Sequence, residues 1–328
     1  MSENPLALEL NKLKAQGVSL YDLTQSNPTQ AGIVYPQELI LKALVNPQNL
    51  VYTPHPKGLL LAREAVVRYY ADRGMVVSAE NIVLTSSSSE AYGFLFRLLM
   101  DPNDRLLLPA PSYPLFSYLA GLNDVEVAYY HIYFDGHGWR IDFDSMEESI
   151  ERGTRAIVLV SPNNPTGSCV KPEEIRRLNA LCVQHKVALI SDEVFIDYIL
   201  DDTAVQYQSL SQNTGALSFT LGGLSKAMAL PQMKLGWIVV NGPKKDVKAA
   251  LDRLEVIADT YLSVNTPVQH AASVWLPERG VIVDQILTRV RANEKCLKAA
   301  VMDAGLKSFP IEGGWYGLVQ LVLDEPED

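Results

Sequence analysis

The chain has 328 residues, 48% hydrophobic and 20% charged, which is the composition of an ordinary globular protein. The net charge of −10 argues against nucleic acid and anionic membrane as partners. Its three cysteines, Cys169, Cys182 and Cys296, form neither a metal-binding spacing nor a disulfide framework, and the first residues form no apolar leader. We therefore expect a cytoplasmic protein with more than one domain, no metal site and no membrane anchor.

Patterns of helix and strand alternate along the first three quarters of the chain. Residues 4–16 predict a short amphipathic helix, and residues 58–73 predict a stronger one with an apolar face. Seven short apolar runs follow, at residues 81–85, 105–108, 125–130, 156–160, 187–190, 217–221 and 235–240. Continuous apolar strands that alternate with helices predict an α/β fold with a mostly parallel, seven-stranded sheet covered on both faces.

The pattern changes after the last of these runs. Residues 242–258 and 281–304 each predict a long helix, and residues 315–323 resemble a strand.

Polar loops follow five of the predicted strands, namely SSSSEAY, PAPSYP, SPNNPTG, SDEVF and GGLSK. In an open parallel sheet, ligands bind at the carboxyl ends of the strands. The side chains of these loops are of kinds that could line one anionic, aromatic ligand. This convergence is the main functional signal that comes from the residues alone.

The serines of the first loop have two readings. Ser87, Ser88 and Ser89 lie between a strand and a predicted helix at residues 90–100. They are either ordinary N-capping residues or part of a turn that binds a phosphate at the helix N-terminus.

Three further places in the sequence also have two readings each. Asp192 belongs either to a solvated acidic loop or to a site where it pairs with a protonated ring nitrogen, and Glu193 shares that loop. The segment around Asn164 is either a plain turn or the source of an amide donor. Tyr113 is either a core aromatic or a flat stacking surface.

Lys226 is a surface lysine by default, but its neighbours in GGLSKAMALP are apolar or small. Desolvation there would lower its pKa and favour formation of a Schiff base. Lys234 follows eight residues later and could add positive charge near a phosphate.

Taken in order, these segments resemble the class I/II aminotransferases, which are fold-type I pyridoxal-phosphate enzymes. The motifs that carry the resemblance are YTPHPKGLLLAREA, TSSSSEAY, PSYP, SPNNPTG, SDEVF and LSKAMALPQMKLGW. The resemblance runs from about residue 20 to the end of the chain. It implies a large cofactor-binding domain at residues 45–245 and a smaller α+β domain from residues 1–44 and 246–328, incomplete at the C-terminus.

The resemblance also implies a role for each residue around the cofactor ring. Lys226 matches the lysine that forms the Schiff base with pyridoxal phosphate and later moves the proton. Asp192 matches the aspartate that keeps the pyridine nitrogen protonated. Tyr113 matches the stacking aromatic, and Asn164 matches the amide that binds the phenolate oxygen.

Other matches concern the phosphate. Ser87, Ser88 and Ser89 match the turn that holds it, and Tyr52 matches a tyrosine that reaches the phosphate of the neighbouring subunit. The resemblance therefore implies a homodimer.

Several positions depart from the family pattern. Phe195 stands where many members have a tyrosine that binds the phenolate oxygen, so one hydrogen bond is missing. Lys234 replaces a more frequent arginine and loses its bidentate geometry. Ser26 stands where glycine is common, and with Asn27 it falls on the loop that covers the substrate. No residue matches the C-terminal arginine that usually binds the substrate carboxylate.

Transamination between an amino acid and a 2-oxo acid is the leading interpretation. One alternative is a C–S β-lyase with the same cofactor, and another is a cofactor-binding protein with weak or no turnover because the arginine is absent. A ligand-sensing module of a transcription regulator is disfavoured by the −10 charge. On this basis we expect cofactor binding with poor turnover.

Overall fold

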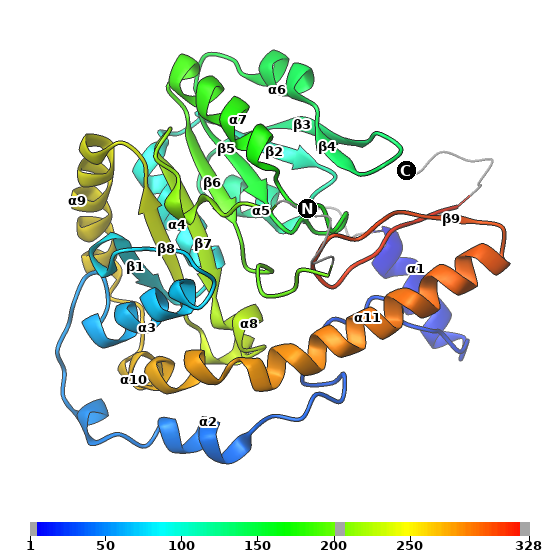
Figure 1. Cartoon of the computed structure of the whole chain (residues 1–328), viewed down its shortest axis with the longest axis horizontal. Coiled ribbons are helices and arrows are strands. Elements are labelled where there is room, and N and C mark those ends of the chain that lie inside the picture. Colours follow the sequence, from blue (N-terminus) through cyan, green and yellow to red (C-terminus); the bar gives the residue numbers. More distant parts are fainter. Residues whose placement is uncertain (1–4, 201–206, 322–328) are drawn as a thin grey trace. The chain divides into compact units, whose positions relative to one another are not determined.

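The computed structural model describes residues 5–200 and 207–321 (Figure 1). The chain divides into two compact units. The first unit ends at Ile33, and the second begins at Val34. Helix α1 (Pro5–Ala15) forms most of the regular structure of the first unit and confirms the helix predicted at residues 4–16.

The second unit is built on an eight-stranded sheet with the strand order β1-β8-β7-β6-β5-β2-β3-β4. Its strands are β1 (Ile82–Thr85), β2 (Arg105–Ala110), β3 (Glu126–Phe134), β4 (Trp139–Ile141), β5 (Thr154–Val160), β6 (Ala188–Asp192), β7 (Ser218–Gly223) and β8 (Gly236–Asn241). The strands from β7 through β6, β5 and β2 to β3 run parallel, whereas β8 is antiparallel to both of its neighbours. All seven predicted runs are strands, which confirms the mostly parallel α/β fold. Strand β4 was not predicted, because three residues are too few to show a pattern.

Helices of ordinary length fill the connections of the second unit. They are α2 (Gln37–Ala43), α3 (Leu60–Ala71), α4 (Ser88–Leu99), α5 (Leu115–Gly121), α6 (Phe143–Ser149), α7 (Pro172–His185), α8 (Leu224–Ala227), α9 (Lys244–Tyr261), α10 (Thr266–Trp275) and α11 (Gly280–Asp303). Short 3-10 helices lie at η1 (Pro47–Leu50), η2 (Ala79–Asn81), η3 (Leu210–Gln212), η4 (Pro231–Met233) and η5 (Leu276–Glu278). The predicted helices at residues 58–73, 90–100, 242–258 and 281–304 are confirmed as α3, α4, α9 and α11, the last being the long orange helix of Figure 1.

A small second sheet pairs β9 (Lys307–Ser308) with β10 (Val319–Gln320) in antiparallel fashion. The strand predicted at residues 315–323 is therefore much shorter within the described part of the chain, and residues 322 and 323 lie outside it.

Both faces of the large sheet are buried. Leu106 and Leu108 of β2 pack in a core with residues of α4 and α9, whereas Leu107 between them packs with residues of α6 and α7. Successive side chains of a strand point to opposite faces, so two buried faces require a continuous apolar run. Each buried leucine stabilises the fold by roughly 1.5–3 kcal/mol. This rigid sheet carries the loops that form the candidate site.

Candidate active site

Loops that follow β1, β5, β6 and β7 meet at the carboxyl edge of the sheet. The main-chain N–H of Ser161, after β5, donates to the carbonyl of Asp192 at the end of β6, at 2.9 Å. From the loop after β7, Lys226 Nζ lies 5.1 Å from the ring centroid of Phe195. The structure thus brings together residues that are far apart in the sequence.

Lys226 lies in the one-turn helix α8, directly after β7. Its Nζ is close to two aromatic rings, 5.1 Å from the centroid of Phe195 and 4.6 Å from that of Trp315. Burial lowers the pKa of the Lys226 ammonium, and the nearby charge of Asp192 opposes that shift. Desolvation therefore increases the neutral fraction, which is the form that attacks a carbonyl carbon.

Glycines bring β7 and β8 close together just before this lysine. A Cβ atom on Gly222 would lie 2.5 Å from Nε1 of Trp237 in the neighbouring strand. A Cβ atom on Gly223 would lie 3.0 Å from the carbonyl oxygen of Leu235. The glycines of GGLSK are therefore required for packing at the end of the sheet.

Asp192 is the last residue of β6 and is only 6% exposed. Its carboxylate accepts hydrogen bonds from the hydroxyl of Tyr92 and the main-chain N–H of Val194, both at 3.2 Å. Burial raises its pKa to about 6. Within the described residues the carboxylate forms no ion pair, so a cationic ring nitrogen would supply the missing countercharge.

Glu193 is also buried, but its carboxylate is fully occupied. It accepts hydrogen bonds from Ser191 Oγ at 2.9 Å, Tyr207 Oη at 3.0 Å, Ser209 Oγ at 2.5 Å and the Leu210 N–H at 2.8 Å. The reading of this loop as solvated is therefore wrong. Glu193 fastens residues 207–210 to the end of β6 and has no free acceptor directed at a ligand.

The serine turn caps helix α4. Ser87 Oγ accepts a hydrogen bond from the N–H of Glu90 at 3.1 Å, and the Glu90 carboxylate accepts one from the N–H of Ser86 at 2.7 Å. The helix begins at Ser88, two residues earlier than predicted. The N–H groups of Ser88 and Ser89 have no hydrogen bond within the described part of the chain. Ser87 is thus an N-cap, and the turn still offers free donors to an anion.

Strand β8 begins against this turn. A Cβ atom on Gly236 would lie 2.9 Å from the carbonyl carbon of Ser87 and 3.1 Å from the nitrogen of Ser88. Lys234, two residues earlier, is exposed and adopts a positive φ of 55°. It forms no ion pair with any residue that the structure describes. The turn and this lysine therefore fit a phosphate group.

The two asparagines of SPNNPTG differ in their surroundings. Asn163 is buried, and its Oδ1 accepts hydrogen bonds from the N–H of Thr166 at 3.2 Å and from the hydroxyl of the same residue at 3.0 Å. Asn164 is partly exposed, and its side chain has no hydrogen bond within residues 5–200 and 207–321. The first asparagine forms the turn, and the second leaves its amide available to a ligand.

Tyr113 is 46% exposed, so its reading as a core aromatic is wrong. Its ring meets Phe116 edge to face with a centroid distance of 6.1 Å. Phe116 packs on Tyr92, whose hydroxyl binds Asp192. A contact chain thus links the exposed tyrosine ring to the buried carboxylate.

Trp315 is a site residue that the sequence patterns do not reveal. It lies between β9 and β10, where its indole ring packs against Phe195 with a centroid distance of 5.3 Å. Phe195 itself is buried, as expected for a residue without a hydroxyl group to satisfy. The two glycines that precede Trp315 in GGWYG are the only local signal, and nothing in the sequence connects them to Lys226.

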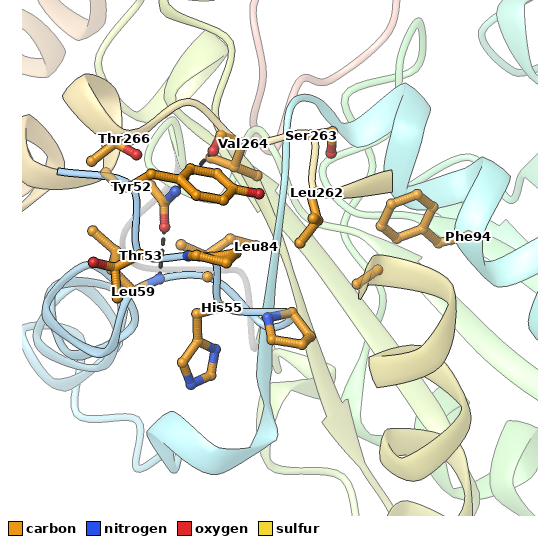
Figure 2. A pocket seen from close by; sticks show the side chains of 15 residues that line it. Tyr52, Thr53, His55, Leu59, Leu84, Phe94, Leu262, Ser263, Val264 and Thr266 are labelled. Atoms are coloured by element: carbon orange, nitrogen blue, oxygen red, sulfur yellow. Dashed lines mark hydrogen bonds between the residues drawn. The ribbon is translucent and has the colours of Figure 1, made fainter. Parts of the chain in front are cut away.

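Tyr52 lines a separate pocket, shown in Figure 2, with His55, Leu59, Leu262 and Val264. It is 78% exposed and makes no ring contact or hydrogen bond with Lys226 or Asp192 within the described chain.

The wall of this pocket is nevertheless linked to the serine turn. Ser263, which lines the pocket, donates a hydrogen bond to the Glu90 carboxylate at 2.7 Å. The hydrogen bonds drawn in Figure 2 join the side chain of Gln269 to Leu59 N and Val264 O, which fixes the two walls to each other.

Ser26 and Asn27 belong to the first unit. Asn27 Oδ1 accepts hydrogen bonds from the N–H of Thr29 at 3.0 Å and from its hydroxyl at 2.7 Å. This turn is local, so the role of both residues at the substrate stays a prediction.

The described residues contain no metal site and no membrane-spanning helix. No group of three or more His, Cys, Asp or Glu side chains among them is arranged to hold a metal ion. None of their helices has the length and apolar character needed to cross a membrane.

The sheet and the loops at its carboxyl edge are typical of fold-type I pyridoxal-phosphate enzymes, and comparisons with known proteins agree. The family model described as aminotransferase class I and II matches residues 19–322. Glutamate-pyruvate aminotransferase AlaA of Escherichia coli K12 is 32% identical over 273 residues, which cover 83% of this chain and 67% of that protein. Alanine aminotransferase of Mycobacterium bovis is 30% identical over 296 residues, covering 89% and 68% of the two chains.

Solved structures have the same fold. An aminotransferase from Escherichia coli has a TM-score of 0.82 at 27% identity, covering 97% of this chain and 80% of that one. Alanine aminotransferase from Pyrococcus furiosus has a TM-score of 0.86 at 22% identity, covering 98% and 82%. The chain belongs to the class I and II aminotransferases. It is a pyridoxal-phosphate-dependent enzyme that acts on amino acids and 2-oxo acids, which confirms the predicted family, cofactor and activity.

Proposed function

We propose that this aminotransferase moves an amino group between glutamate and pyruvate, with Lys226 as the residue that binds the cofactor. The substrate pair is supported by the names of the relatives at 30–32% identity, which are glutamate-pyruvate and alanine aminotransferases. The observation that carries the role of Lys226 is its desolvated amine, which lies beside two aromatic rings and interacts with the charge of the buried Asp192.

Lys226 and Asp192 perform the two central tasks in this proposal. When bound, pyridoxal phosphate supplies an aldehyde that takes up amino groups and a ring that accepts electrons from the substrate Cα. Lys226 Nζ would hold the cofactor through its aldehyde carbon and, once a substrate amine has taken its place, would move a proton at the substrate Cα as a general base and acid. The Asp192 carboxylate would hold the proton on the ring nitrogen, because a cationic partner relieves the cost of its burial.

Two residues would orient the ring. The exposed Tyr113 would stack on it, and the free amide of Asn164 would donate to its phenolate oxygen. Phe195 packs against the aromatic cluster and donates no hydrogen bond.

The serine turn would hold the phosphate. The N–H groups of Ser88 and Ser89 would donate to it together with the hydroxyls of this turn, in which Ser87 caps the helix. Lys234, two residues before β8, would add a positive charge. Donors at a helix N-terminus and a nearby cation are the usual partners of a phosphate.

A homodimer completes the site in this proposal. The segment before α3 exposes large apolar side chains, with Leu50 92% and Tyr52 78% accessible. Leu262, on the wall of the same pocket, is also exposed. A second copy would cover these side chains and receive Tyr52 at its phosphate. Ser26 and Asn27 would cover the substrate.

The enzyme works in the cytoplasm, which agrees with its unpaired cysteines.

A visible spectrum tests the role of Lys226. We expect the purified enzyme with pyridoxal phosphate to show the absorbance band of a lysine-linked cofactor, and Lys226→Ala to lack it. Addition of glutamate should bleach the band of the wild-type enzyme, and pyruvate should restore it. Borohydride reduction followed by peptide mapping should place the cofactor on Lys226.

The same material tests the alternative of a C–S β-lyase. A lyase releases pyruvate and ammonia from a cystathionine-like thioether without any 2-oxo acid acceptor, whereas a transaminase does not.

A wild-type protein that forms no band with excess cofactor would overturn the role of Lys226.

A further inference from the structure

Trp315, whose ring lies beside the reactive lysine, carries an unused hydrogen-bond donor. Its indole ring lies 4.6 Å from Lys226 Nζ and meets Phe195 and Tyr198 edge to face, with centroid distances of 5.3 and 5.0 Å. Its Nε1 atom is buried and has no hydrogen-bond partner within the described chain. An unpaired buried N–H costs about 1–3 kcal/mol, so its retention at a site calls for a physical reason.

The segment that carries Trp315 is firmly fixed. The N–H groups of Glu312 and Gly313 donate to the carbonyl of Gly167 at 3.2 and 2.9 Å, and the N–H of Gly314 donates to the carbonyl of Tyr198 at 2.8 Å. A Cβ atom on Gly313 would lie 2.7 Å from Cγ of Pro162. The unpaired donor is therefore not explained by a loose segment.

A buried ion pair fastens the same segment to the loop after β5. The Glu312 carboxylate pairs with the ammonium of Lys171 and accepts a hydrogen bond from the N–H of Cys169 at 2.6 Å. Lys171 Nζ also donates to the carbonyl of Cys169 at 2.8 Å. These contacts hold Trp315 over Lys226 before any ligand arrives.

The chemistry beside Trp315 selects an anion. The indole N–H only donates, and the centroid of its ring lies 4.6 Å from Lys226 Nζ, where the substrate reacts in the proposed site. A carboxylate accepts charge-assisted hydrogen bonds, which are shorter and stronger than neutral ones. Both substrates of the proposed reaction carry a carboxylate next to the reacting carbon.

We infer that the indole N–H of Trp315 donates a hydrogen bond to the carboxylate of the amino acid or 2-oxo acid that reacts at Lys226. The inference rests on the proposed function, because it names a substrate contact of the same site. Trp315 is then a substrate-binding residue that also encloses the lysine.

Trp139 provides a matched control. Its Nε1 atom is likewise buried without a partner in the described residues, and its ring packs on Phe134 and Phe309, with centroid distances of 5.8 and 5.2 Å. In the same part of the chain it has no ring contact with Lys226. A change from Trp to Phe removes the N–H at either position and keeps an aromatic ring.

The test measures the binding of glutarate, a five-carbon dicarboxylate that lacks the reacting group, to the cofactor-loaded enzyme by calorimetry. We expect Trp315→Phe to raise the dissociation constant about tenfold, the loss of one hydrogen bond to a charged group. Trp139→Phe should leave it within about twofold of wild type. Equal affinities of the wild type and Trp315→Phe, or an equal loss in both variants, would overturn the inference.

A second measurement starts from the wild-type enzyme. The chain has four tryptophans, so indole ¹⁵N labelling of the wild-type enzyme gives four N–H signals. Glutarate should move one of these signals downfield. The variant Trp315→His keeps a ring N–H donor, so it should lack that signal but retain part of the affinity for glutarate. A spectrum in which glutarate moves no signal, or a wild type that does not bind glutarate, would contradict the inference. Turnover of glutamate and pyruvate, measured separately, decides the proposed function.

Discussion

Burial acts on Asp192 and Lys226 in the same sense, because it favours the neutral form of each. The pKa of the aspartate rises and that of the lysine falls, and the attraction between their charges opposes both shifts. Asp192 would be ionised at neutral pH only at a cost that a cationic partner relieves. The cofactor ring supplies such a partner in the proposed site.

The pH dependence of stability tests this account of Asp192. Its pKa of about 6 in the folded state exceeds the ordinary value of 3.8. The contribution of Asp192 to the free energy of unfolding is therefore fully present below pH 3.8 and is lost as pH rises through 6. We expect cofactor-free Asp192→Asn to match the wild type near pH 4 and to exceed it near pH 7. Near pH 7 the free energies of unfolding of the variant and the wild type should differ by at most on the order of 3 kcal/mol.

Denaturant unfolding at both pH values measures this difference. In the cofactor-loaded enzyme the order at pH 7 should reverse, because asparagine cannot balance a ring cation. An Asp192→Asn variant that is less stable than cofactor-free wild type at pH 7 would show that hydrogen bonds outweigh the buried charge.

At the scale of elements, helix α4 depends on its first residues. Ser87 caps the helix through the N–H of Glu90, and the N–H groups of the next two residues have no hydrogen bond within the described part of the chain. Capping and phosphate binding are therefore compatible in one turn, because they use different donors.

Substitution of the cap tests both roles, and a control cap elsewhere separates them. We expect Ser87→Ala to lower the free energy of unfolding by about 1 kcal/mol and also to weaken cofactor binding. Ser78, which accepts a hydrogen bond from the N–H of Glu80 at the start of η2, is the control. Ser78→Ala should lose stability only. Fluorescence titration with pyridoxal phosphate compares the two, and equal cofactor affinities would argue against the phosphate site.

At the scale of the whole molecule, the exposed apolar side chains of residues 41–52 call for a partner surface. Val51 is half exposed between Leu50 and Tyr52, whose side chains are largely exposed. We expect Val51→Asp to shift a homodimer toward monomer and to weaken cofactor binding. Val76→Asp, at an exposed position before η2, should keep the dimer. Sedimentation measures the oligomeric state of both variants. A monomeric wild-type enzyme would refute the dimer.

The division into domains is a further proposal at this scale. We propose a large domain at residues 45–245 and a small domain from residues 1–44 and 246–328. Ala250, Leu254 and Ala258 of α9 pack in the core of the large sheet, so a boundary after α9 is the alternative. Limited proteolysis of the loaded enzyme would distinguish cleavage near residue 245 from cleavage near residue 262.

The sequence alone determined the sheet and the family and named most residues of the candidate site, for physical reasons. Strands buried on both faces are continuously apolar, so seven of the eight strands were visible, and parallel strands place the loops after them at one edge. The order of strands and loops along the chain is therefore enough to make Lys226, Asp192, Tyr113 and Asn164 candidates.

Only the tertiary structure decided which polar groups are already satisfied. Asn163 and Glu193 look as functional as their neighbours in sequence, yet hydrogen bonds from distant or turn residues occupy them. Trp315 shows the opposite case. Its donor is unpaired and lies beside Lys226, 89 residues away in the chain (315 − 226), because the fold brings the two together. Periodicity reveals which face of an element is buried, but not which partner meets it there.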